Sequence, residues 1–194
     1  YSEVMKYDVG LKVHSRFPQQ QKMKVYKPLL STVIDSVEMH AKTNHKQPLF
    51  YNIETKIRPQ ADNIFHPEPK EFVDLMMGVI LQKKIENRVI IQSFDIRSLQ
   101  YLHQKYPNIK TALLVEAFDK KELVKQIEDL GFMPTIYSPA QELVNLKLVQ
   151  ECRVKKIKLI PWTVNDLETI HKFAAMGVDG IISDYPNLFF EEQK

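Results

Sequence analysis

The stretch Phe50-Tyr51-Asn52-Ile53-Glu54-Thr55-Lys56 carries the strongest structural signal in this chain. It alternates apolar and polar side chains as a β-strand does, and a period of two places Glu54 and Lys56 on the same face. Active sites of α/β proteins lie at the carboxyl ends of their strands. A carboxylate there suits a hard cation, and an ammonium suits a phosphate oxygen. A bare Glu-x-Lys is more often an exposed ion pair on an edge strand, so its interpretation depends on the strands that follow.

The length and charge of the chain limit its domain count and its partners. With 194 residues, of which 44% are hydrophobic, the chain can bury one core, and we predict a single domain over residues 1–194. The formal net charge is +3, and the basic residues are interspersed with acidic ones. This argues against a dedicated nucleic-acid binder, whereas a small anionic substrate is compatible with it.

The cysteine content and the apolar runs exclude further classes of protein. Cys152 is the single cysteine, which excludes an internal disulfide framework and a cysteine-rich zinc site, and we expect it to be a half-buried helix residue. No apolar run approaches the roughly 18 residues of a membrane span, and no signal peptide is present. The chain begins at Tyr1 without an initiator Met. We therefore expect its natural N-terminus to be missing, and the residues alone do not indicate a compartment.

Strands and helices alternate along most of the chain. A helix at residues 29–42 precedes the first strand, and a long loop at 57–69, which includes His66, follows that strand. Loops of this length are usually functional or disordered. The predicted strands lie at 49–56, 89–94, 111–116, 133–137, 158–163 and 181–184. The predicted helices after them lie at 70–87, at 96–106, from 120, up to 153, up to 176 and from 186.

Several polar residues at the predicted helix starts favour capping over catalysis. Each of them stands where an unpaired backbone N–H needs an acceptor, and three have a Glu or Gln three residues later, as in a capping box. We predict Asp95, Asp119, Ser138 and Asn165 as these caps. Asp184 is expected to fix the final turn.

Six βα units in succession predict a parallel sheet with right-handed crossovers, either doubly wound or closed as a (β/α)₈ barrel. The strands are short, apolar and β-branched, as strands buried on both faces should be. No Gly-x-Gly-x-x-Gly follows a strand and no Walker-type lysine loop is present, so dinucleotide and nucleoside-triphosphate binding lose their main support. A barrel needs eight units and usually about 250 residues. If this is a barrel, we expect its first two strands to lie before Tyr1.

Four motifs, in this order and spacing, resemble the glycerophosphodiester phosphodiesterase family, and the resemblance covers nearly the whole chain. Arg16-Phe17-Pro18 and His66-Pro67-Glu68-Pro69 are similar to bacterial members. The four motifs are Tyr51-Asn52-Ile53-Glu54-Thr55-Lys56, Gln92-Ser93-Phe94-Asp95, Pro161-Trp162-Thr163-Val164-Asn165 and Gly177-Val178-Asp179-Gly180-Ile181-Ile182-Ser183-Asp184-Tyr185-Pro186.

The resemblance implies a TIM-type (β/α)₈ barrel of the phosphatidylinositol-phosphodiesterase-like kind, present as a partial barrel of about six βα units. It implies hydrolysis of small glycerophosphodiesters to sn-glycerol 3-phosphate and an alcohol, in lipid and glycerol metabolism, with a bound divalent cation, Ca²⁺ or Mg²⁺. The compartment is periplasmic or secreted, or else cytoplasmic, and the resemblance slightly favours the periplasm.

The resemblance also assigns roles to individual positions of this chain. Glu54 matches the family's metal-binding glutamate, and Lys56 matches the lysine that faces the substrate phosphate. Phe94 and Trp162 match aromatic positions that wall the glycerol side of the pocket. Glu116 ends a predicted strand on the same edge, and we expect it to hydrogen-bond to the groups around the metal and substrate.

The chain departs from the family pattern at its catalytic histidines. The His-Arg-Gly and His-Asp motifs are absent, as is the Glu-x-Asp pair that completes the metal site, and none of the six histidines stands in a matching motif. In the family one histidine attacks or activates and the other protonates the leaving alkoxide. All the missing parts belong upstream of Tyr1. We therefore expect the C-terminal part of an enzyme, with no catalytic residue of its own and essentially no turnover by these 194 residues alone.

Other functions stay open on the residues alone. One is a related barrel hydrolase of the sphingomyelinase D or phosphatidylinositol phospholipase C type, which would accept substrates without the free diol of glycerol. Another is a non-catalytic barrel that binds glycerophosphodiesters or a protein partner. A third is a six-stranded doubly wound fold of unrelated function, which would show an open sheet with edges.

Overall fold

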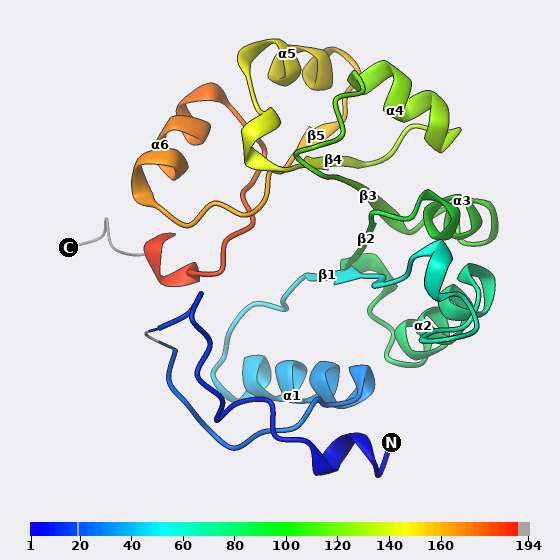
Figure 1. The fold of residues 1–194 in the computed structure, drawn as a ribbon, viewed down its shortest axis with the longest axis vertical. Helices are drawn as coiled ribbons and strands as arrows, with labels where there is room; N and C mark the ends of the chain where they lie inside the picture. The colour runs from blue at the N-terminus through cyan, green and yellow to red at the C-terminus, as the bar shows by residue number, and fades with distance from the viewer. Residues whose placement is uncertain (19, 190–194) are drawn as a thin grey trace. The chain divides into compact units, whose positions relative to one another are not determined.

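A computed structural model describes residues 1–18 and 20–189 of the chain, which forms two compact units, Tyr1–Leu49 and Phe50–Lys194. The first unit is mostly irregular (Figure 1). Its main element is α1 (Leu30–Thr43), which confirms the helix predicted at 29–42 and buries Ile34 and Ala41. A short 3₁₀ helix, Val4–Lys6, lies near the start.

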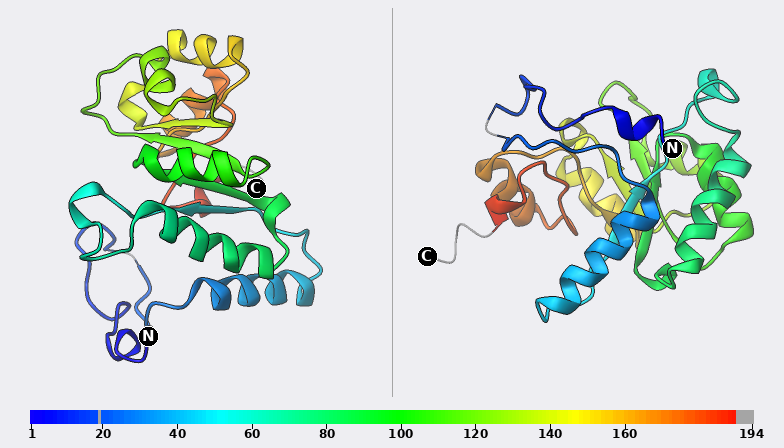
Figure 2. Two further views of the ribbon diagram at one scale, coloured as in Figure 1. Left: turned by 90° about the vertical axis from the view of Figure 1, so that its right-hand side faces the viewer. Right: turned by 90° about the horizontal axis from the view of Figure 1, so that it is seen from below.

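The second unit is built on one parallel sheet. Its strands follow the order β1-β2-β3-β4-β5, so each is hydrogen-bonded to the next along the chain. Figures 1 and 2 show the sheet curving, with its helices along the outer side. The strands are β1 (Tyr51–Glu54), β2 (Val89–Ser93), β3 (Lys110–Val115), β4 (Ile136–Pro139) and β5 (Lys158–Leu159). The helices are α2 (Pro69–Gln82), α3 (Ile96–Lys105), α4 (Leu123–Leu130), α5 (Leu146–Val154) and α6 (Leu167–Met176). Short 3₁₀ helices lie at Pro59–Ala61, Glu86–Arg88, Gln141–Leu143 and Pro186–Phe189.

The sixth predicted strand, at residues 181–184, lies beside β5 without forming a regular strand. The Ile182 N–H donates to the Pro161 carbonyl, and the Ile182 carbonyl accepts from the Val164 N–H, at 2.9 and 3.0 Å. The regular strand β5 ends at Leu159, but hydrogen bonds to β4 continue toward the predicted end at 163, because the Ile160 N–H donates to the Tyr137 carbonyl and the Trp162 N–H to the Pro139 carbonyl, both at 3.1 Å. On the opposite side, which faces residues 181–184, Pro161 has no N–H to donate. The predicted sixth unit is therefore present as irregular backbone pairing followed by the short 3₁₀ helix Pro186–Phe189, at the predicted helix start.

One of the four predicted helix caps is confirmed. The Asp95 side chain accepts a hydrogen bond from the Arg97 N–H at the start of α3. The prediction for Asp119 was wrong, because α4 begins only at Leu123 and Asp119 instead accepts from the Lys121 N–H in the turn before it.

The predicted cap at Ser138 was also wrong. Ser138 lies inside β4, buried, and its hydroxyl donates to the Ile160 carbonyl at 2.6 Å. The following helix, α5, starts later and is capped by Asn145, which accepts from the Leu148 N–H. A hydroxyl that satisfies a neighbouring strand is not available to begin a helix.

Asn165 does not cap α6, contrary to prediction, because the next residue does. Asp166 accepts from the Thr169 N–H at 2.7 Å. The Asn165 amide instead donates to the Asp184 carboxylate and its carbonyl accepts from the Asp184 N–H, both at 2.9 Å. Asp184 thus fixes the final turn, as predicted.

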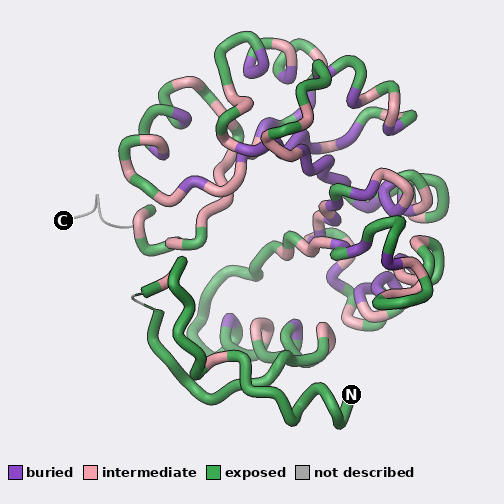
Figure 3. The backbone as a smooth tube through the Cα atoms, viewed as in Figure 1, coloured by how far each residue is buried: buried purple, intermediate pink, exposed green. Residues whose placement is uncertain are grey.

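The core follows the strands and the inward faces of the helices, which Figure 3 colours as buried. Cys152 is fully buried in α5, where we predicted half burial. Its burial, which disfavours the charged thiolate, raises the pKa of the thiol to about 12. None of the helices in residues 1–18 and 20–189 combines the length and the apolar character that crossing a membrane requires.

Candidate active site

Glu54 and Lys56 lie side by side where β1 ends. The Lys56 Nζ is 2.7 Å from the Glu54 Oε1, and the side chains are 78% and 18% exposed, respectively. Both line a hollow of about 460 Å³, which we call the Glu54 hollow. The prediction that the two side chains share one face, at the carboxyl end of a parallel strand, is confirmed. The remaining lining residues are Thr55, Ile57, Arg58, Ala61, Phe65, His66, Phe94 and Glu116.

The Glu54 carboxylate has a buried oxygen that suits a cation. Its Oε1 is buried and accepts no hydrogen bond in the described part of the chain, since the Lys56 ammonium lies close without hydrogen-bond geometry. The Lys56 ammonium at 2.7 Å balances the charge of this oxygen, and a hard divalent cation is an alternative partner for it. Residues 1–18 and 20–189 contain no cluster of three or more His, Cys, Asp or Glu that could hold a metal. Glu54 is therefore suited to supply one ligand of a larger set.

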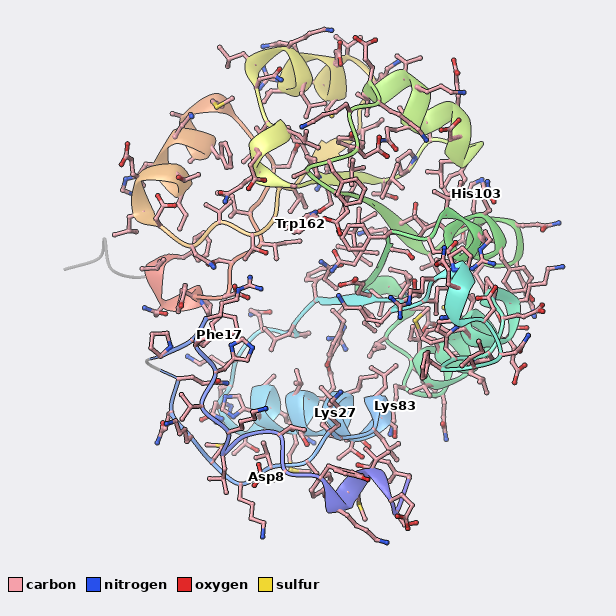
Figure 4. The ribbon with its side chains drawn as sticks, in the orientation of Figure 1. Asp8, Phe17, Lys27, Lys83, His103 and Trp162 are labelled. Atoms are coloured by element: carbon pink, nitrogen blue, oxygen red, sulfur yellow. The ribbon has the colours of Figure 1, made fainter. Side chains whose placement is uncertain are left out.

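Phe94 and Trp162 form an aromatic pair beside this hollow. Their ring centroids are 5.4 Å apart and the rings are nearly perpendicular, an edge-to-face contact. Phe94 lines the Glu54 hollow, and Trp162 adjoins the hollow through it. The Trp162 indole donates to the Ser138 carbonyl at 2.9 Å, which fixes its ring on the inner side of the curved sheet (Figure 4).

The long loop at 57–69 is ordered and forms one wall of the hollow. Arg97 holds it: the guanidinium contacts the Asp62 carboxylate of the loop at 2.6 Å and the Asp95 carboxylate, also at 2.6 Å. Within the loop, the His66 Nε2 accepts from the Arg58 N–H at 3.1 Å, and its Nδ1 lies 2.9 Å from the Pro67 carbonyl. Both ring nitrogens of His66 are thus used to shape the loop, which leaves neither for acid–base chemistry.

The family model for the glycerophosphoryl diester phosphodiesterase family matches residues 1–188. The chain belongs to this family. A glycerophosphodiester phosphodiesterase of Bacillus subtilis (strain 168) is 30% identical over 200 residues, which cover 100% of this chain and 64% of that protein. One from Caldanaerobacter subterraneus subsp. tengcongensis is 26% identical over 186 residues, or 95% of this chain and 67% of the relative. The chain thus spans about two thirds of the length of these relatives.

Solved structures of glycerophosphoryl diester phosphodiesterases and related phosphodiesterases have the same fold. A family member from Silicibacter pomeroyi DSS-3 superposes with a TM-score of 0.75 at 26% identity, over 89% of this chain and 59% of that one. A phosphodiesterase from Oleispira antarctica, solved with the product sn-glycerol-3-phosphate, gives 0.75 at 19% identity, over 98% and 68%. The predicted TIM-type barrel is confirmed as a partial barrel, and the doubly wound alternative is excluded, because the helices cover one side of the sheet.

A buried cluster of hydroxyl groups lies behind the Glu54–Lys56 pair. Thr55, between Glu54 and Lys56, points away from them and donates to the Ser93 hydroxyl at 2.6 Å. Ser98 lies 3.2 Å from the Thr55 hydroxyl and donates to that of Ser93 at 3.1 Å. Sequence spacing does not reveal this cluster. Period two does place Thr55 on the opposite face of the strand, but its partners lie 38 and 43 residues away along the chain.

Replacing Thr55 by Val should lower the free energy of unfolding by about 1–3 kcal/mol, because the change keeps the shape of the side chain and leaves two buried hydroxyls short of a partner. Urea unfolding monitored by circular dichroism measures the loss. Thr32→Val, at an exposed position of α1, is the matched control and should change stability little. Equal stability of T55V and the wild type would contradict a stabilising role for the cluster.

Arg97→Ala should lower the free energy of unfolding by about 2 kcal/mol, because it leaves the Asp95 carboxylate, 5% exposed, without its charged partner. The same change should speed tryptic cleavage at Arg58, since the loop loses its anchor at Asp62. Arg97→Lys keeps the charge but not the fork of donors, and should recover only part of both effects. Unchanged cleavage in R97A would show that the loop is held by other contacts.

The Asp62 carboxyl should make the stability of the chain depend on acid pH. Hydrogen bonds from the Arg97 guanidinium, opposed in part by desolvation, hold the pKa of Asp62 below its ordinary value. A lowered pKa contributes stability that is present above the unfolded-state pKa, about 3.9, and is lost as the pH falls through the folded-state value. Unfolding midpoints measured from pH 5 to pH 2 should therefore fall more steeply for the wild type than for R97A. If the unfolding midpoints of the wild type and R97A fell in parallel with pH, the lowered pKa of Asp62 would not be due to Arg97.

Proposed function

We propose that this chain contributes the substrate-binding and metal-binding side of an enzyme that hydrolyses glycerophosphodiesters to sn-glycerol 3-phosphate and an alcohol. The observation that carries the proposal is the Glu54–Lys56 pair, at the carboxyl end of β1 and open to a hollow with aromatic walls. Membership of the family and the names of the relatives support the same reaction.

The electrostatic part of the reaction rests on Glu54 and Lys56. A phosphodiester is anionic and repels nucleophiles, so its hydrolysis needs fixed positive charge at the phosphoryl oxygens. Glu54 would hold a divalent cation, Ca²⁺ or Mg²⁺, through its buried Oε1, which accepts no hydrogen bond from the described residues, and a bound cation would polarise a phosphoryl oxygen. Lys56, whose side chain is largely exposed to the hollow, places its ammonium against another phosphate oxygen.

The aromatic pair and Glu116 would bind the glycerol end of the substrate. Phe94 and Trp162 offer flat apolar walls to the C–H faces of glycerol, and the hydrogen bond from the Trp162 indole holds that wall still. Glu116 lines the same hollow and can accept a hydrogen bond from a glycerol hydroxyl. Such a pocket favours substrates with a free diol over phospholipid-like diesters that lack one.

Calorimetric titration of the chain with sn-glycerol 3-phosphate tests the proposal. We expect saturable 1:1 binding that is strengthened by Ca²⁺ or Mg²⁺, because both the cation and Lys56 face the phosphate. Methyl phosphate, which has the phosphate without the glycerol, should bind more weakly, and glycerol alone should not bind measurably. Equal affinity for sn-glycerol 3-phosphate and methyl phosphate, with no effect of divalent cations, would refute the proposal.

A further inference from the structure

A hollow of about 320 Å³ lies at the amino end of the sheet, between the end of α5, the start of β5 and the turn after α6; we call it the Arg153 hollow. Its lining shares no residue with the Glu54 hollow. Because the strands are parallel, the start of β5 and the end of β1 lie at opposite ends of the sheet. The Arg153 hollow is therefore separate from the candidate active site.

Three basic side chains line this hollow, and none has a carboxylate partner in the described part of the chain. They belong to Arg153 at the end of α5, Lys156 in the turn after it and Lys158 at the start of β5. None of them forms an ion pair or a side-chain hydrogen bond with a described residue. By contrast, the ammonium of Lys147, near the start of α5, is 3.4 Å from the Glu122 carboxylate. Three cations at one hollow repel each other, and an anion between them removes this cost.

The negative charges at this hollow offset only part of the positive ones. Asp179 contributes one carboxylate, which accepts a hydrogen bond from the Leu159 N–H at 2.9 Å. The carboxyl ends of α5 and α6 also lie here, and each carries about half a negative charge. Against three cations, these sources leave an excess of about one positive charge. The hollow therefore favours an anion.

The turn after α6 makes room for the Arg153 guanidinium. Gly177 caps α6 in the left-handed region, with a φ of 83°, and has no side chain. A Cβ atom at this position would lie 2.9 Å from the Arg153 Nη2, closer than Cβ atoms approach other groups in proteins, so the guanidinium packs against the Gly177 backbone. A guanidinium carries five donors in a planar fork, which matches two oxygens of one phosphate group, whereas Lys156 and Lys158 act as point charges.

The hollow is apolar on its inner side, and its size suits a small ligand. Val149, Ile157 and Leu159 line it and are buried. Apolar surroundings lower the local dielectric constant, which strengthens the attraction between the cations and an anion. The volume of about 320 Å³ lies at the lower end of the range for small-molecule sites, roughly 300–1,000 Å³. A compact anion, or the anionic group of a larger molecule, suits this space.

We propose that the Arg153 hollow binds a dianionic phosphate group, carried by a free small molecule or by a lipid headgroup. Arg153 donates two hydrogen bonds to this group, and Lys156 and Lys158 contribute positive charge. A phosphate monoester carries about 1.5 to 2 negative charges at pH 7, so it matches three cations better than a carboxylate, which carries one. The inference goes beyond the proposed function, because this ligand is bound without reaction, at the other end of the sheet from Glu54 and Lys56.

Titration with inorganic phosphate, followed by NMR and calorimetry, tests the inference. The Lys56→Met variant is used without divalent cations, so that binding in the Glu54 hollow is suppressed. Phosphate should shift the backbone amide signals of residues 153–159 and 177–179 and leave those of 54–56 unchanged. In this background Arg153→Gln and Lys158→Met should each weaken binding about tenfold, because each removes a charge-assisted contact. Lys172→Met, at an exposed position of α6, is the matched control and should keep the affinity.

Two results would overturn the inference. Acetate, with half the charge of phosphate, should bind about tenfold more weakly, and equal binding of the two anions would exclude a site for a dianion. Phosphate binding that R153Q and K158M leave unchanged would place the anion on other residues. Far-UV circular dichroism of each variant shows that it is folded, so a loss of affinity reports on the site.

Cosedimentation with phosphatidylcholine vesicles, with and without phosphatidic acid, separates the two sources of the phosphate group. Recruitment that needs phosphatidic acid and is lost in R153Q supports a lipid headgroup. Binding of inorganic phosphate without recruitment to either vesicle supports a free phosphate compound. If neither phosphate nor phosphatidic acid binds, the inference is overturned, whereas the proposed function, which rests on Glu54 and Lys56, is unaffected.

Discussion

Replacing Glu54 by Gln should remove the stabilisation of this chain by divalent cations. Because Glu54 is only one ligand of a larger set, this chain should bind the cation weakly, so the cation has to be added far above its dissociation constant. A ligand that binds only the folded state at a hundred times its dissociation constant stabilises it by about 2.7 kcal/mol. Gln keeps the size of the side chain but offers a neutral oxygen to the cation, and hard cations prefer charged carboxylates. Thermal unfolding with and without Ca²⁺ or Mg²⁺ should show a shift for the wild type and none for E54Q.

The same substitution should weaken cation-dependent binding of sn-glycerol 3-phosphate by about a hundredfold, because the phosphate loses its partner ion. Glu128→Gln, which removes an exposed carboxylate from α4, serves as the control and should keep both the shift and the affinity. Without cations, E54Q should differ little in stability from the wild type, because the Glu54–Lys56 ion pair that it loses has a largely exposed ammonium. A cation-dependent shift that persists in E54Q would place the metal on other residues.

The architecture of the second unit could be predicted because local patterns determine it. Short β-branched runs separated by amphipathic helices admit few arrangements, and five of the six predicted strands form a single parallel sheet. The caps could be predicted less well. Asn165 and Asp166 are adjacent, and the side chain of either could cap α6. Asn165 instead donates a hydrogen bond to Asp184, so Asp166 is the cap. The contact between Asn165 and Asp184 joins residues 19 apart in the chain, and sequence spacing does not predict it.

The candidate site shows the same division between local and long-range information. The common face of Glu54 and Lys56 follows from the period of a strand, and the structure confirms it. The groups that hold this pair and its loop in place do not follow from any period. Thr55 bonds to Ser93, and Arg97 joins Asp62 to the start of α3, through contacts that arise only once the strands are aligned. Sequence spacing thus predicted the placement of Glu54 and Lys56 and not the contacts that support them.

Lys56→Met should weaken binding of sn-glycerol 3-phosphate by about tenfold to a hundredfold, since an ion-pair contact to a phosphate oxygen is worth about 1.5–3 kcal/mol. Met keeps the unbranched stem and removes only the charge. The Lys56 side chain is 78% exposed, so the substitution should cost little stability. Calorimetric titration of the folded variant measures the change in affinity directly.

The outcome at Lys56 also separates the two positive charges of the proposed site. Because the ammonium lies 2.7 Å from the Glu54 Oε1, it competes with a divalent cation for that oxygen. K56M should therefore bind Ca²⁺ or Mg²⁺ at least as tightly as the wild type while its affinity for sn-glycerol 3-phosphate falls, and in E54Q both affinities should fall. Lys172→Met, at an exposed position of α6, is the matched control. If K56M instead lost cation binding and kept its affinity for sn-glycerol 3-phosphate, Lys56 would be a partner of the carboxylate alone and the phosphate would have to lie elsewhere.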